Sequence, residues 1–170
     1  MNFNTIKNIE IEARKILSKY EINEVPVLVE DIAKKMGIKI SYAPSNEYSG
    51  MLIRKEGEQA LMGVNSNESK TRMRFTIAHE IAHFIFDKKT AVTIDYRNNG
   101  NVFDKSLEEK RADVFAANLL MPKKWLQLDV EKISKENFSK DKVADLARKY
   151  GVSTEAMTYR LINLNLITGN

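Results

Sequence analysis

Apolar residues recur at intervals of three and four along much of the chain, which is the spacing of one face of an α-helix. In the first such stretch, residues 4–20, this face consists of Ile6, Ile9, Ala13, Ile16 and Leu17. A second helix is expected after the break at residues 24–27. It should end at Met36, because the following Gly37 is a natural helix stop. Both helices are predicted to pack on a core.

The pattern changes to that of strands between residues 38 and 64. Residues 38–42 alternate between apolar and polar positions, and two apolar runs at 50–54 and 60–64 flank a turn at 55–58. The two runs predict a hairpin. Together with the first strand they predict a sheet of about three strands ahead of the next helix.

Four further helices are predicted in the second half of the chain, at residues 108–121, 123–130, 142–151 and 153–162. Gly151 joins the last two, and Ser153 can cap the second, which gives them helix-turn-helix form. The chain therefore indicates an α+β fold. We expect a core domain at residues 1–130 and a helix-turn-helix-like helical segment at 131–170.

The helix before residue 87 carries an apolar row at Met73, Ile77, Ile81 and Ile85, so most of its surface is expected to be buried. It also contains the pattern His79-Glu80-x-x-His83, with the only two histidines of the chain. Residues four apart lie on one helix face, about 6 Å apart along the axis, so both imidazoles can bind one metal ion. Glu80 flanks the same face and can act as general base on a water. An ordinary pair of packed histidines is the alternative.

A second polar pair on the helix at 108–121 supports the metal site. Glu109 and Asp113 are four residues apart and share a face. A two-histidine zinc site commonly takes a carboxylate as third ligand, which predicts Glu109, and Asp113 can accept the free ring N–H of a ligating histidine. Two alternatives remain open: Glu109 can instead complete a capping box with Ser106, and Glu108 can compete as the ligand.

The sequence resembles the ImmA/IrrE family of metallopeptidases in two motifs. These are Arg-Phe-Thr-x-Ala-His-Glu-x-x-His from Arg74, and Glu-x-x-Ala-Asp-x-Phe-Ala-Ala-x-Leu-Leu-Met-Pro from Glu109. The resemblance implies a zincin-like core of the gluzincin type, with ligands His79, His83 and Glu109, base Glu80 and outer carboxylate Asp113. It further implies an endopeptidase that cleaves a helix-turn-helix repressor of a mobile element or stress regulon and so derepresses its genes. Asn118 stands where the family pattern has Glu, at a position expected to be exposed.

Other polar residues are candidates for supporting roles. Tyr96 is the nearest tyrosine in sequence and can donate to a developing oxyanion, with Tyr48 and Tyr42 as competitors. Arg72 and Arg74, in the first turns of the histidine helix, are either surface charges or steer a peptide. The 50–64 hairpin either covers the core or holds substrate by strand addition. The polar segment 87–105, with a short strand expected at 93–96, is a candidate lid or substrate loop.

Composition narrows the function classes further. The chain has 170 residues and no cysteine, so a disulfide framework and a thiolate metal site are excluded. His and carboxylate ligands accept Zn²⁺ and also Mn²⁺. No signal peptide or membrane-length apolar stretch is evident, which predicts a cytoplasmic protein.

The helix-turn-helix-like segment is a weak candidate for reading DNA. Residues 131–170 hold seven Lys or Arg against five Asp or Glu, a net charge of only +2. The positions expected to be exposed on its second helix are Thr154, Glu155, Thr158, Arg160 and Asn163. Direct DNA binding is therefore not expected. The alternatives to a peptidase are a catalytically silent metal protein that inactivates a repressor by binding it, and a DNA-binding regulator.

Overall fold

A computed structural model describes residues 1, 3–96, 105–133 and 139–167. The elements, in chain order, are helices α1 (Phe3–Lys19) and α2 (Val29–Lys35), strands β1 (Ile38–Ala43), β2 (Tyr48–Ile53) and β3 (Ala60–Asn65), helix α3 (Lys70–Phe86), strand β4 (Val92–Tyr96), and helices α4 (Leu107–Leu120), α5 (Lys123–Glu131), α6 (Lys140–Tyr150) and α7 (Thr154–Asn163). The predicted α+β class is confirmed. No helix of the described residues is long and apolar enough to span a lipid bilayer.

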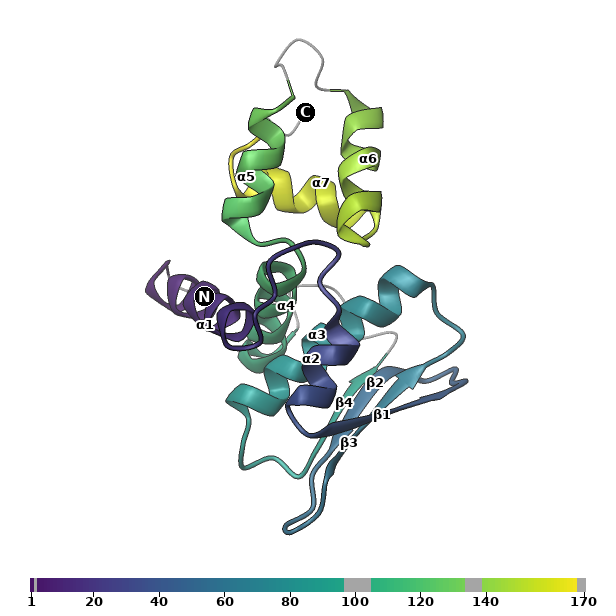
Figure 1. Cartoon of the computed structure of the whole chain (residues 1–170). Coiled ribbons are helices and arrows are strands. Elements are labelled where there is room, and N and C mark those ends of the chain that lie inside the picture. Colours follow the sequence, from purple (N-terminus) through teal and green to yellow (C-terminus); the bar gives the residue numbers. More distant parts are fainter. Residues whose placement is uncertain (2, 97–104, 134–138, 168–170) are drawn as a thin grey trace.

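The sheet has the strand order β1-β3-β2-β4, and helices α2 and α3 lie on one side of it (Figure 1). Strand β1 pairs with β3 in parallel, whereas β2 pairs antiparallel with both β3 and β4. The short strand expected at 93–96 therefore becomes a fourth strand, outside β2. Because both strands of the 50–64 hairpin are paired on each side, the prediction that this hairpin receives a peptide by strand addition is wrong. The edges of the sheet are β1 and β4.

Helix α3 runs through the middle of the molecule, between the sheet and α4 (Figure 1). The Ser69 hydroxyl caps its N-terminus by accepting a hydrogen bond from the backbone N–H of Arg72, 3.2 Å away. Ile77, Ala78, Ile81 and Ala82 are at most 1% exposed. The predicted burial of this helix is therefore confirmed, and it brings His79 and His83 into the interior.

The α5–α7 helices lie at the end of the molecule opposite the sheet, and buried polar contacts attach them to the core (Figure 1). The Arg160 guanidinium donates to the Met121 carbonyl (3.0 and 3.1 Å) and to the Asn118 Oδ1 (2.7 Å). Arg160 and Asn118 are 9% and 6% exposed, so the predictions that they are surface residues are wrong. Sequence periodicity could not show that the two side chains satisfy each other between α4 and α7. The boundary at residue 130 stays a prediction.

Arg74 makes a second attachment of the same kind. Its guanidinium donates to the Gly151 carbonyl at 3.0 Å and to the Val27 carbonyl at 2.8 Å. It therefore joins the turn between α6 and α7 to α3 and to the loop before α2. This is a structural role, and neither of the two roles considered for Arg74 from the sequence.

We predict that Arg160→Leu lowers the free energy of unfolding by about 2–4 kcal/mol, because it leaves the buried Met121 carbonyl and Asn118 amide without their charged partner. Arg148→Leu is the matched control: this arginine is 75% exposed and should change stability by at most about 0.5 kcal/mol. Urea unfolding followed by circular dichroism measures both. Equal stability of the two variants would contradict the anchoring role.

Candidate metal centre

Three side chains from two helices converge on one point. His79 and His83 project from α3 and Glu109 from the first turn of α4, and their candidate ligand atoms all lie within 4.8 Å of one another. The two Nε2 atoms are 3.1 Å apart. Glu109 places Oε2 3.2 Å from the Nε2 of His79 and Oε1 3.3 Å from that of His83. Both histidines are at most 2% exposed.

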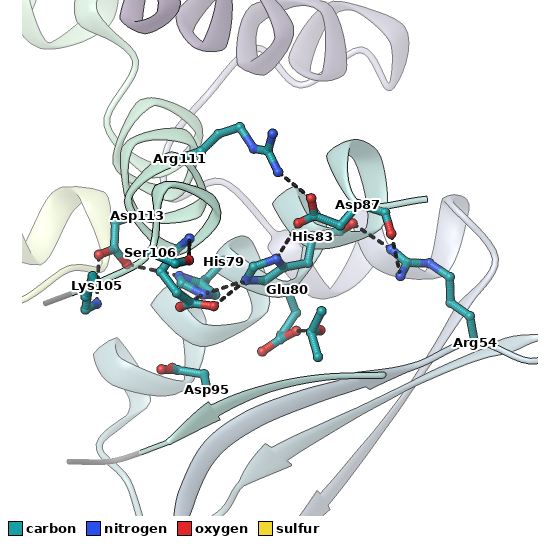
Figure 2. A network of polar contacts seen from close by, with 12 residues as sticks. Arg54, His79, Glu80, His83, Asp87, Asp95, Lys105, Ser106, Arg111 and Asp113 are labelled. Atoms are coloured by element: carbon teal, nitrogen blue, oxygen red, sulfur yellow. Dashed lines mark hydrogen bonds and ion pairs between the residues drawn. The ribbon is translucent and has the colours of Figure 1, made fainter. Parts of the chain in front are cut away.

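A carboxylate holds the other nitrogen of each histidine ring. The Nδ1 of His79 lies 3.0 Å from Asp113 Oδ1, and the Nδ1 of His83 lies 2.7 Å from Asp87 Oδ2 (Figure 2). A carboxylate only accepts, so each Nδ1 carries the proton. In the neutral rings the two Nε2 lone pairs then point toward each other and toward the Glu109 oxygens. Such a convergence of acceptors repels unless protons or a cation lie between them.

The pKa shifts show which groups would carry protons to offset the repulsion between these acceptor atoms. Burial alone lowers the pKa of His79, but its contacts with Asp113 and Glu109 raise it to about 10. Burial raises the pKa of Glu109, but the two histidines lower it by more, so the net pKa lies well below its usual range. Glu109 Oε2 is buried and accepts no well-directed hydrogen bond. A divalent cation can replace these protons, because metal binding to imidazole and carboxylate releases them. The donor set fits Zn²⁺.

Glu80 lies beside these ligands, on the part of α3 that faces the sheet (Figure 2). Its carboxylate is 0% exposed; Oε2 accepts a hydrogen bond from the Thr93 hydroxyl on β4 (3.1 Å), and Oε1 has no partner among the described residues. Burial raises the pKa of Glu80 to about 7. A carboxyl group with such a pKa is suited to accept and return a proton near neutral pH.

Strand β2 approaches this carboxylate closely, and only a glycine permits the approach. A Cβ atom at Gly50 would lie 2.4 Å from the Thr76 Cγ2 and 3.1 Å from the Glu80 Oε1. Thr76 is itself buried, so it has little room to move. The backbone of β2 therefore forms the wall behind Glu80.

At the N-terminus of α4, Glu109 takes part in the helix cap with Ser106 and also faces the histidines, so the two roles considered for it are compatible. The Ser106 hydroxyl caps the helix by accepting from the Glu109 N–H at 3.2 Å, while the Glu109 side chain remains directed to the histidines. Glu108 is exposed and is not among the three converging ligands. The fold thus brings together His79, Glu80, His83, Glu109 and Asp113.

Tyr96 is not brought to this cluster. It ends β4 and is 51% exposed. Its neighbour Asp95 faces α3, where it accepts from Arg72 at 3.2 Å, and successive strand residues point to opposite faces. Tyr42, on the other sheet edge, is 49% exposed. Arg72 is therefore tied to the sheet beside the site, rather than being a free surface charge.

Sequence reasoning missed a group of polar residues around the ligands: Arg54, Asp87, Thr93, Asp95, Lys105 and Arg111. Lys105 donates to Asp113 at 2.8 Å, and Arg111 donates to Asp87. Only Asp87 had a readable signal, because it follows His83 by four residues, the helical spacing that also relates the two histidines. Arg111 lies on α4, and the other four come from strands or the ends of loops; the position of all five relative to the histidines depends on the tertiary fold.

Comparison with known proteins identifies the family of the chain and a shared fold. Among curated proteins, none matches the chain. Among solved structures, a Mycobacterium tuberculosis transcriptional regulator superposes with a TM-score of 0.63 at 14% identity, over 92% of this chain and 46% of that one. This chain thus spans about half of that regulator, and the likeness shows a shared fold. The model of a peptidase family, described as the IrrE N-terminal-like domain, matches residues 33–162, which include the three candidate metal ligands. The chain therefore belongs to the IrrE N-terminal-like peptidase family.

Proposed function

We propose that this protein is a zinc-dependent endopeptidase that cleaves a helix-turn-helix transcriptional repressor at a specific site and so derepresses its genes. The observation that carries the proposal is the convergence of His79, His83 and Glu109 beside the buried carboxylate of Glu80. Family membership supports a metallopeptidase-like role. A repressor substrate would place the protein in the cytoplasm. Mn²⁺ remains a second candidate ion for this ligand set.

His79, His83 and Glu109 would hold the ion, and Asp113 would keep the His79 ring in the tautomer that presents Nε2. A bound zinc ion supplies Lewis acidity toward a peptide carbonyl and toward water. Glu80 accepts the proton of the attacking water at Oε1, which has no partner in the part of the chain that the structure describes, and passes it to the leaving amine. Thr93 donates to the second carboxylate oxygen, Oε2, and so fixes the orientation of the Glu80 carboxylate.

Strand β4 is suited to hold the substrate backbone. It is an edge strand, and through Thr93 it contacts Glu80 directly. An extended peptide that pairs with the outer side of β4 would extend the sheet and run past the ligands. This role passes to β4 from the 50–64 hairpin, whose strands are both interior.

The structure gives little support to a DNA-binding regulator. Arg160 is the only Lys or Arg of α7, and it is buried against α4. On α6, Arg148 and Lys142 pair with Asp145, and Lys149 pairs with Asp129. A recognition helix needs exposed side chains that reach base edges. We therefore assign α6 and α7 to packing or substrate docking.

We expect Glu80→Gln to retain the metal and to lower the cleavage rate by a factor of about 10²–10⁴, since Gln cannot take a proton. The test is intact-mass analysis of helix-turn-helix repressors from the same genome, each incubated with the zinc-loaded protein, with metal content measured in parallel. A Gln variant that cleaves at the wild-type rate would refute the base assignment. Metal binding and repressor binding without any cleavage by the wild type would favour the silent binding protein.

We expect Glu109→Ala to weaken zinc affinity by more than about 100-fold, beyond what removal of an outer partner costs. Glu108→Ala is the matched control, because it removes the adjacent carboxylate from the same helical turn and should leave the affinity unchanged. Competition with a chromophoric chelator measures both affinities. If Glu108→Ala caused the larger loss, the ligand assignment would move to Glu108.

A further inference from the structure

The C-terminal end of α3 carries a polar network that the proposed function does not use. Asp87, the C-cap residue, places Oδ2 2.7 Å from the Nδ1 of His83 and accepts from Arg111 with Oδ1 (Figure 2). The Asp87 side chain is 13% exposed and that of Arg111 is 28% exposed. Both oxygens of this carboxylate are therefore committed, one to a ligand ring and one to a cation.

Arg111 belongs to α4, two residues after Glu109. Its ion pair with Asp87 therefore connects the helix that supplies two candidate ligands to the helix that supplies the third. The Arg111 guanidinium also lies 4.9 Å from the centre of the Phe86 ring, which limits its freedom. Arg54, from just after β2, fixes the same helix end by donating to the carbonyls of His83 (2.6 Å) and Asp87 (3.3 Å).

His79 is also held by a carboxylate that is itself paired with a cation. Asp113 accepts from the Nδ1 of His79 with one oxygen and from Lys105 with the other. There, however, the carboxylate comes from α4 itself, so the histidine contact spans the two helices directly. For His83 the carboxylate is the C-cap residue of the helix that carries the ring, and Arg111 connects this carboxylate to α4.

We propose that Asp87 and Arg111 form a positioning pair for the metal centre, in which Asp87 orients the His83 ring and Arg111 fixes Asp87 relative to Glu109. This inference rests on the metal site of the proposed function. The pair holds the His83 Nε2 toward the point where the other ligands converge. It also keeps the Asp87 carboxylate occupied, so that it does not compete as a ligand itself.

The test measures zinc affinity by chelator competition, with the visible absorption spectrum of the Co²⁺ form as a second readout of ligand geometry. Asp87→Asn should weaken zinc binding by about 10- to 100-fold, because Asn keeps the shape but loses the charge that both His83 and Arg111 use. The Co²⁺ spectrum should change as well. Asp129→Asn is the matched control: Asp129 is 11% exposed and bonded to Lys149 and Tyr150, away from the ligands, so its loss tests plain destabilisation.

Arg111 is tested through its dependence on Asp87. Arg111→Met should weaken zinc binding, and Arg111→Lys should restore part of the loss, because it returns the charge without the fork geometry. Since Arg111 acts through Asp87, the double variant Asp87→Asn/Arg111→Met should bind zinc no more weakly than Asp87→Asn alone.

The outcomes separate this inference from the proposed function. Wild-type zinc affinity and an unchanged Co²⁺ spectrum in Asp87→Asn would overturn the positioning pair and leave the peptidase proposal intact. Equal losses in Asp87→Asn and Asp129→Asn would also overturn it, by showing a general effect of destabilisation. Additive losses in the double variant would remove Arg111 from the pair. A wild-type protein that binds neither Zn²⁺ nor Co²⁺ would overturn the proposed metal site and the pair together.

Discussion

The mutual repulsion of the acceptor atoms on His79, His83 and Glu109 is the constraint on which the rest of the structure depends. The two imidazole Nε2 atoms are 3.1 Å apart, and each lies within 3.3 Å of a different Glu109 oxygen. Such an arrangement of acceptors, in a site that excludes most water, is unfavourable unless a positive charge lies between them. Helices α3 and α4 pack closely enough to impose this arrangement, with Ala112 and Ala116 fully or almost fully buried on α4. Packing energy from the apolar core thus maintains a local arrangement that favours cation binding.

The repulsion between these acceptor atoms also accounts for the charged residues that surround the candidate ligands. Each histidine has a carboxylate at its Nδ1, and each of these carboxylates has a cation of its own. Lys105 and Arg111 therefore prevent the outer carboxylates from adding further unbalanced negative charge to a site that already holds Glu80 and Glu109. The sheet contributes Thr93 from β4 and Arg54 from the end of β2. The site is consequently supported from both sides of α3.

Features that depend on helical periodicity could be predicted from the sequence. The spacing of His79 and His83, and of Glu109 and Asp113, determines which side chains share a face, and the two faces meet as expected. The order of strands could not be predicted in this way, because β4 follows α3 in the chain yet pairs outside β2. The same holds for Arg160 and Asn118: each is polar and predicted at the surface, and each is buried where it bonds to the other and to a backbone carbonyl. Pairing between distant segments has no periodic signal in a single sequence.

The close approach of β2 at Gly50 has a consequence for how the motif on α3 is interpreted in other sequences. Any side chain placed there would begin with an atom that pushes on Thr76 and on the carboxylate of Glu80. A single codon change at this glycine would thus displace the Glu80 carboxylate while the His79-Glu80-x-x-His83 motif itself stays intact. A genome survey that scores only the His-Glu-x-x-His motif would not distinguish that altered copy from an unaltered one.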